Sequence, residues 1–188
     1  MKKTFTLFFI TIATIASIYA LIRYVGMQSF PFSFACWLNF ILLAGVRSFT
    51  ETQKSRFTSS YFNEQAWERG GKIYERLGIN FYRKLLVAIG WERYITKKYN
   101  RVEKNNEALI HLHYETKHGE LGHIITLIIV LGFNIFVAFK FGVIKSLWLL
   151  ILNITLNLYP VFLQRYNRPR IERLINLSKH RKRRPHNI

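Results

Sequence analysis

Hydrophobic residues gather in four blocks along the chain, and polar residues fill the segments between and after these blocks. The blocks cover residues 4–25, 30–46, 121–139 and 143–163. Because an α-helix rises about 1.5 Å per residue, about 20 apolar residues cross the ~30 Å hydrocarbon core of a bilayer. The pattern therefore predicts an all-α, polytopic membrane protein with about four transmembrane helices.

The first block follows two lysines, Lys2 and Lys3, and has an alternative interpretation as a secretory signal peptide. Ala20 could end such a peptide, but Ile18 stands where a cleavage site needs a small residue. The apolar run is also longer than the hydrophobic core of a signal peptide. These features favour a retained transmembrane helix.

The last two blocks are separated only by residues 140–142, which predicts a helical hairpin. Asn153 and Asn157 lie one turn apart in the fourth block, so both are expected on the same face of the helix. Polar side chains at this depth avoid lipid and face another helix or a polar cavity. Helix packing is the favoured role for the two asparagines, and a substrate contact is the alternative.

The segment between the second and third blocks is too polar to cross a membrane, yet its apolar residues recur at helical spacing. Gly70 and Gly71 predict a break or bend in that helix. Residues 79–91 form an apolar run that is too short to span, which predicts an interfacial or re-entrant helix with Trp91 and Tyr94 at headgroup depth. The chain is thus divided into an N-terminal pair of transmembrane helices (1–50), a cytoplasmic or interfacial helical region (51–119), a transmembrane hairpin (120–164) and a basic cytoplasmic tail (165–188).

Positive charge is distributed unevenly, and this asymmetry predicts the orientation in the membrane. The formal net charge is +18, and 24 of the 28 lysines and arginines lie in residues 1–3, 48–119 and 165–188. By the positive-inside rule, these segments and both termini are cytoplasmic, in a bacterial-type inner (plasma) membrane. A nucleic-acid partner is not expected, because no nucleic-acid-binding module remains outside the apolar blocks.

The acidic residues and the cysteine exclude several kinds of chemistry. All ten acidic residues are glutamates, and the single cysteine is Cys36. Without aspartate there is no Ser-His-Asp triad, no Asp-rich magnesium site and no His-x4-Asp dyad of the common glycerol-phosphate acyltransferases. One cysteine excludes a disulfide framework and a thiolate metal site.

The densest group of ionisable residues is 115–123, where a helix that begins near residue 105 is expected to run into the third block. Glu120 and His123 are three residues apart, so their side chains are expected to meet on one helix face at the membrane entrance. A carboxylate beside an imidazole raises the basicity of the ring, which makes His123 a candidate general base. Alternatively, the group simply anchors the helix end at the interface.

The other histidines of this segment, His111, His113 and His118, are expected to be solvated. No metal site is expected, because the spacing matches neither a His-Glu-x-x-His site nor a paired Glu-x-x-His site.

A second cluster follows the fourth block and contains Arg165, Arg168 and Arg170. Planar guanidinium groups suit phosphates, either those of lipid headgroups or those of a nucleotide-bearing donor such as coenzyme A. The later basic run, residues 179–184, is expected to be a solvated tail on an anionic leaflet.

Two segments, ETKHGELGHIITLIIVLGF (115–133) and VFLQRYNRPRIERLINL (161–177), resemble the glycosyl-4,4′-diaponeurosporenoate acyltransferase family, small membrane proteins of staphyloxanthin-type carotenoid synthesis. The pattern E-T-K-x-x-E-L-x-H, followed by Q-R-Y-N-R-P-R, carries the resemblance. A looser likeness extends it to roughly residues 67–183. The matching positions are Glu115, Lys117, Glu120, His123, Gln164, Arg165, Tyr166, Asn167, Arg168, Pro169 and Arg170.

The resemblance implies transfer of a fatty acyl group, with acyl-coenzyme A as the co-substrate and no resident cofactor, to a hydroxyl of a glycosylated lipid or carotenoid. The family assigns no catalytic residue, and we infer that His123 is the base and that Glu120 or Glu115 orients it. Asn167 or Tyr166 is placed near the thioester carbonyl. The residues expected to bind substrate are Lys117, Gln164, Arg165, Tyr166, Asn167, Arg168 and Arg170.

Residues 81–84 depart from the family pattern and leave the identity of the acceptor open. The alternative function is a non-catalytic membrane subunit or lipid-binding adaptor that docks a protein partner through its basic face. A small transporter is disfavoured by the scarcity of charge within the apolar blocks.

Overall fold

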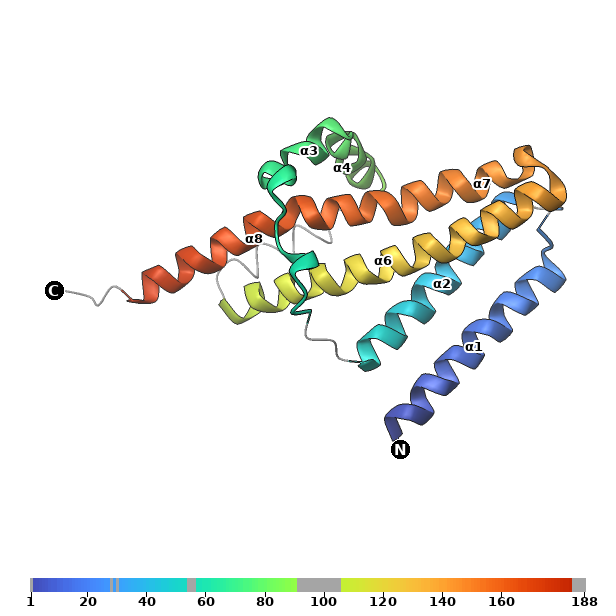
Figure 1. Ribbon diagram of the computed structural model, residues 1–188, viewed down its shortest axis with the longest axis horizontal. Coiled ribbons are helices and arrows are strands. Elements are labelled where there is room, and N and C mark those ends of the chain that lie inside the picture. Colours follow the sequence, from blue (N-terminus) through green and yellow to red (C-terminus); the bar gives the residue numbers. More distant parts are fainter. Residues whose placement is uncertain (1, 28, 30, 54–56, 91–105, 184–188) are drawn as a thin grey trace. The chain divides into compact units, whose positions relative to one another are not determined.

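The structure is a computed structural model that describes residues 2–27, 29, 31–53, 57–90 and 106–183. All regular elements among these residues are helices (Figure 1). The all-α prediction is therefore confirmed.

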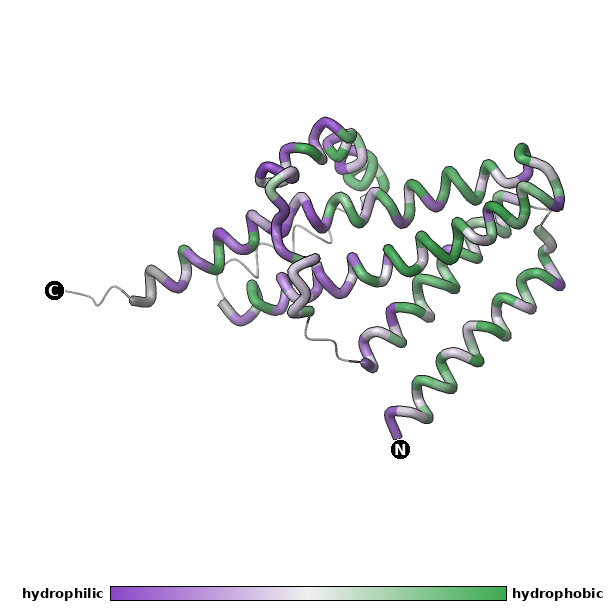
Figure 2. Tube along the Cα trace, in the orientation of Figure 1, coloured by the Kyte–Doolittle hydropathy of each residue, from purple (hydrophilic) through white to green (hydrophobic). Residues whose placement is uncertain are grey.

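Four helical segments of the described chain are long and apolar enough to cross a membrane. Figure 2 shows apolar residues along α1, α2, α7 and the later part of α6. The protein is therefore a multi-pass membrane protein, as the hydrophobic pattern predicted. The first three segments are α1 (Lys2–Tyr24), α2 (Pro31–Gln53) and α6 (Asn106–Phe141), and the fourth joins α7 (Val143–Asn153), the π-helical turn η3 (Ile154–Leu158) and α8 (Tyr159–Arg183).

The chain divides into two compact units, which we describe separately. The membrane unit comprises Met1–Arg56 and His118–Val161, and the polar unit comprises Phe57–Lys117 and Phe162–Ile188.

The membrane unit buries an apolar core between its helices and turns many large apolar side chains outward. In α1 only Leu21 is buried, while residues such as Phe5 and Phe9 are exposed, as expected of a helix whose surface contacts lipid. Gly45 of α2 allows close approach of α1, because a Cβ there would lie 2.3 Å from Thr14 Oγ1. The buried core residues are Leu21, Phe34, Ala35, Leu38, Leu42, Val130, Val137 and Leu149.

The predicted hairpin between the third and fourth blocks is present. Helix α6 ends at Phe141, and α7 begins at Val143 after Gly142, whose φ of 95° requires glycine. Asn134 Nδ2 donates a hydrogen bond of 2.7 Å to the carbonyl of Ser146, which ties α6 to α7 close to the turn.

The described residues of the polar unit form four short helices besides their parts of α6 and α8. The predicted break at Gly70 and Gly71 is confirmed, because Arg69, Gly70 and Gly71 all have positive φ. The predicted helix beginning at Ile79 is also present and is too short to span, whereas Trp91 and Tyr94 lie outside the described residues. The short helices are η1 (Ser60–Phe62), η2 (Ala66–Gly71), α3 (Lys72–Arg76) and α4 (Ile79–Ala88).

Candidate functional site

His123 belongs to a hydrogen-bonded network of amide side chains inside the membrane unit. Its Nδ1 lies 3.3 Å from Asn157 Oδ1. Asn157 Nδ2 lies 2.6 Å from Asn39 Oδ1 and 2.8 Å from Asn153 Oδ1. All three asparagines are buried, with exposed fractions of 1–2%. The network thus joins α2, α6, α7 and the η3 turn by polar contacts at membrane depth.

The ends of the network determine the direction of every hydrogen bond in it. Asn39 Nδ2 donates to the carbonyl of Ala35 at 2.8 Å, and Asn153 Nδ2 donates to the carbonyl of Leu127 at 3.0 Å. A carbonyl can only accept, so both asparagines must present Oδ1 to Asn157. Asn157 then has to donate with Nδ2 and accept with Oδ1.

The proton on the imidazole is therefore placed on Nδ1, which is the donor to Asn157 Oδ1. In the neutral ring only one nitrogen carries hydrogen, so Nε2 of His123 is the basic nitrogen. This is the tautomer that a general base needs when its orientation is fixed through the other nitrogen.

The η3 turn places Asn157 beside this ring. The N–H of Tyr159 bonds to the carbonyl of Ile154, five residues earlier, which defines the π-helical register. Pro160 follows and has no N–H to offer to the carbonyl of Leu156. Such π turns are frequent at functional sites.

His118 is buried, not solvated as we predicted, with an exposed fraction of 2%. Its Nε2 lies 2.9 Å from Thr50 Oγ1. The Thr50 hydroxyl donates its only proton to the carbonyls of Val46 and Arg47, so its oxygen accepts from His118. Nε2 of His118 is therefore a donor that ties α6 to α2, because a polar group at this depth is stable only with a partner.

The other predicted histidines differ in their surroundings. His111 is exposed, in agreement with the prediction. His113 is half-buried, and its Nε2 lies 2.9 Å from the Glu172 carboxylate, which can only accept the hydrogen bond. His113 is thus part of the packing between α6 and α8 in the polar unit, beside buried Leu112 and Ile171.

Glu120 and Glu115, the two glutamates assigned to orient His123, are found in different units. Glu120 is fully buried in the membrane unit, with an exposed fraction of 0%. Glu115 is half-buried in the polar unit. Their roles toward His123 stay predictions, whereas Asn157 is a partner of the ring that the sequence did not indicate.

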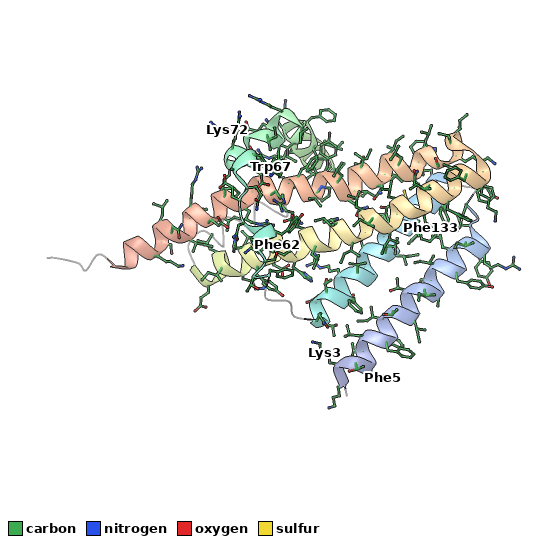
Figure 3. The ribbon with its side chains drawn as sticks, viewed as in Figure 1. Lys3, Phe5, Phe62, Trp67, Lys72 and Phe133 are labelled. Carbon is green, nitrogen blue, oxygen red and sulfur yellow. The ribbon has the colours of Figure 1, made fainter. Side chains whose placement is uncertain are left out.

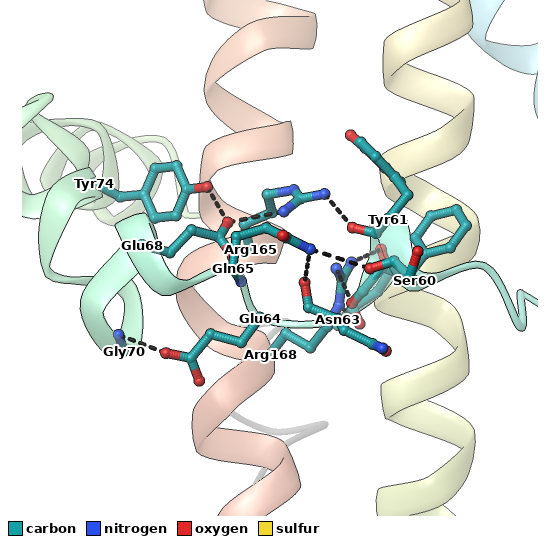
Figure 4. Close-up of polar contacts among 12 residues, drawn as sticks. Ser60, Tyr61, Asn63, Glu64, Gln65, Glu68, Gly70, Tyr74, Arg165 and Arg168 are labelled. Carbon is teal, nitrogen blue, oxygen red and sulfur yellow. Dashed lines mark hydrogen bonds and ion pairs between the residues drawn. The ribbon is translucent and has the colours of Figure 1, made fainter.

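Arg165 is part of a buried cluster in the polar unit (Figure 4). Its Nη1 lies 2.8 Å from Glu68 Oε1, and the hydroxyl of Tyr74 donates to the same oxygen. Its Nη2 donates to the carbonyl of Tyr61 at 2.7 Å. The guanidinium therefore joins α8 to both η1 and η2.

The electrostatics of this cluster favour an ionised Glu68. Burial alone would raise the pKa of Glu68, but hydrogen bonds from the Gln65 N–H, Tyr74 and Arg165, together with the charge of Arg165, lower it below its ordinary value. Burial and the neighbouring carboxylate raise the pKa of Tyr74, so its phenol stays protonated as a donor.

Arg168 and Tyr166 also make contacts within the polar unit. Arg168 is buried and donates to the carbonyl of Phe62 at 3.0 Å. The Tyr166 hydroxyl donates to Glu75 at 3.1 Å. The Arg170 guanidinium stacks over the Tyr166 ring, with its Cζ 3.7 Å from the ring centroid. The binding roles predicted for these residues, and for Lys117 and Asn167, stay predictions.

Gln164 is the predicted site residue with an unused acceptor. Its Oε1 is buried, and no donor among the described residues reaches it. Buried polar atoms are satisfied in the great majority of cases, so this oxygen is a candidate contact for a substrate or a water molecule.

The fold and these sites define a helical, multi-pass membrane protein with a histidine whose proton position is fixed by buried amides. A family model described as glycosyl-4,4′-diaponeurosporenoate acyltransferase matches residues 58–177. Because the match covers more than half of the chain, the protein belongs to this family and is an acyltransferase. No curated protein and no solved structure matches the chain.

Proposed function

We propose that the protein transfers a fatty acyl group from an acyl-coenzyme A thioester to a sugar hydroxyl of a glycosylated diaponeurosporenoate, with His123 as the general base. The family supplies the class of reaction. The observation that supports the role of His123 is its hydrogen bond to Asn157, which leaves Nε2 as the proton acceptor.

The proposed step conserves atoms and charge. His123 Nε2 removes the proton of the sugar hydroxyl as its oxygen attacks the thioester carbonyl carbon. The tetrahedral intermediate collapses, the carbon–sulfur bond breaks, and the thiolate takes the proton back from the imidazolium. Asn157 Oδ1 stabilises the imidazolium through Nδ1–H, in the way that a carboxylate does in hydrolytic triads.

In the polar unit, we assign Arg165 and Arg168 to holding η1 and η2 in place, because both guanidinium groups are buried against protein acceptors. Arg170 is exposed, so its guanidinium is accessible to a phosphate group, and Gln164 offers its unused Oε1. These two residues are the better candidates for substrate contact.

The reaction is placed at the cytoplasmic face of a bacterial inner membrane. The support is the distribution of lysine and arginine, since 24 of the 28 lie in segments that the positive-inside rule assigns to the cytoplasm. Acyl-coenzyme A is a cytoplasmic solute, which agrees with this orientation.

The test is acyl transfer by the purified protein in lipid vesicles, supplied with isotope-labelled acyl-coenzyme A and glycosylated diaponeurosporenoate. Mass spectrometry should find the label in an ester on the sugar. Vesicles without the protein control for spontaneous transfer. Release of free labelled fatty acid without any ester, or no consumption of the thioester, would contradict the proposal.

A further inference from the structure

A hollow on the surface of the polar unit is lined by basic side chains and a tryptophan. It measures about 240 Å³ and lies between η2 and α3. Figure 3 labels Trp67 and Lys72 on this segment. The lining residues are Trp67, Arg69, Lys72, Ile73 and Arg76.

The three cations of this hollow have no carboxylate partner among the described residues. Each glutamate in this part of the polar unit is engaged elsewhere. Glu68 is paired with Arg165, Glu64 accepts the N–H of Gly70 at 2.6 Å, and Glu75 contacts Tyr166 and Arg170. Like charges that share one hollow repel each other, and an anion would relieve this repulsion.

The backbone of the hollow is held in an unusual conformation. Arg69 has a φ of 50°, in the left-handed region that a residue with a Cβ seldom adopts. Such strain persists where the surroundings impose it, often at ligand-binding sites. The neighbouring Trp67 is 58% exposed and rests edge-on against Tyr74, with ring centroids 6.2 Å apart. Its indole is therefore supported on one side and open on another.

We propose that this hollow binds the phosphorylated adenosine end of the acyl donor. This inference rests on the proposed use of acyl-coenzyme A. Arg69, Lys72 and Arg76 neutralise the phosphates, and adenine stacks on Trp67. A nucleotide fits this lining because it combines several phosphates with a flat aromatic ring.

Helix α4, which follows the hollow in the chain, has features that suit the membrane interface, where an acyl donor would lie. Phe81 and Leu85 on this helix, and Ile89 directly after it, are 73%, 40% and 64% exposed, although they are apolar. A short amphipathic helix with exposed apolar side chains is typical of the membrane interface. An acyl chain can then enter the lipid while its nucleotide end stays in water.

A phospholipid headgroup also carries a phosphate, but it has no aromatic base. The experiment therefore measures binding of adenosine 3′,5′-bisphosphate, which lacks both the thioester and the acyl chain, by calorimetry. The protein is held in nanodiscs of phosphatidylcholine, and a second series contains phosphatidylglycerol. The variants are Arg69→Gln with Lys72→Gln, Arg76→Gln, Trp67→Ala and Trp67→Phe. Lys84→Gln is the matched control, because Lys84 is an exposed cation on α4 outside the hollow.

The expected result is binding to the wild type that weakens at least tenfold in the charge variants and in Trp67→Ala. Binding should remain in Trp67→Phe, which keeps an aromatic face, and in Lys84→Gln. No nucleotide binding to the wild type, or equal binding by all variants, would overturn the proposal. Displacement of the nucleotide by phosphatidylglycerol that is insensitive to Trp67→Ala would also overturn it and identify a lipid site.

The binding experiment can fail or succeed independently of the proposed acyl transfer. The binding assay requires no turnover, so His123→Ala should bind the nucleotide as the wild type does. If the nucleotide binds but acyl-coenzyme A is never consumed, the hollow is a nucleotide site and the proposed reaction is wrong. If transfer proceeds and the hollow variants leave the KM for acyl-coenzyme A unchanged, the reaction stands and the hollow is not the donor site.

Discussion

Single hydrogen atoms determine what the histidines of this protein can do. His118 and His123 lie five residues apart on α6, but their surroundings give them different protonated nitrogens. His118 donates through Nε2 to Thr50, whereas His123 donates through Nδ1 to Asn157. The backbone carbonyls at the ends of each network fix these directions. Of these two histidines, only His123 therefore offers Nε2 as a base.

The substitution Asn157→Leu should affect both stability and acyl transfer. It leaves Asn39 Oδ1 and Asn153 Oδ1 without their donor and His123 Nδ1 without its acceptor. Interhelical hydrogen bonds in membranes contribute roughly 0.6–2 kcal/mol each, so the loss of three of them should cost roughly 2–6 kcal/mol. Thermal unfolding in detergent measures it. Thr155→Val is the control, because the Thr155 hydroxyl bonds only within its own helix, to Ile151; equal losses in both variants would contradict the network.

The lowered pKa of Glu68 predicts how the polar unit responds to acid. Because the folded pKa is below the ordinary value of 4.5, the carboxylate stabilises the fold at higher pH. This contribution is lost as the pH falls below 4.5 and through the folded value. Glu68→Gln should lower the unfolding free energy near neutral pH by about 2 kcal/mol and reduce its dependence on pH. Urea unfolding followed at pH values from about 3 to about 7 measures both effects.

The control for this titration is Glu51→Gln, because Glu51 is an exposed carboxylate on α2. Its unfolding curve should keep the acid dependence of the wild type. If the unfolding free energy of Glu68→Gln depends on pH as that of the wild type does, Glu68 does not carry the charge that we assign to it.

At the scale of elements, glycines set how closely the short helices approach α8. Gly71 has a φ of 88°, and a Cβ there would lie 3.2–3.3 Å from backbone and ring atoms of Tyr166. Gly90 has a φ of 79° and no atom within 4 Å of such a Cβ. Both positions thus require a left-handed backbone, but only at Gly71 would a Cβ press against Tyr166.

The pair Gly71→Ala and Gly90→Ala separates these two effects. Both substitutions should cost about 1 kcal/mol for the left-handed backbone. Gly71→Ala should cost a further 1–3 kcal/mol or so, because α3 must move away from Tyr166. Denaturant unfolding of the two variants measures the difference. Equal destabilisation would show that η2 and α3 do not pack on α8 in this way.

The elements themselves were largely predictable from the sequence. Apolar block length predicted the four membrane helices and the hairpin, and Gly70 and Gly71 predicted the break. The partners of the site residues were not predictable, because they are far apart in the chain. Asn39 and Asn157 are separated by 118 residues, and Glu68 and Arg165 by 97. Hydrophobic periodicity places a residue on a face but does not say which residue opposes it.

At the scale of the whole molecule, this acyltransferase has two candidate sites. The membrane unit contains His123 with its buried amides, and the polar unit contains a basic hollow next to α4. We propose that both features serve the acyl transfer that the family implies. The assignment of His123 as the base is the claim on which the mechanism depends.

The most direct measurement is the rate of acyl transfer by His123→Ala and by His111→Gln, both purified in folded form and assayed with the same donor and acceptor. His111 is on the same helix but exposed, so its substitution should leave the rate unchanged. We predict that His123→Ala lowers kcat by about 10²–10⁴-fold, as loss of a general base does. A His123→Ala protein that transfers acyl groups at the wild-type rate would contradict the account.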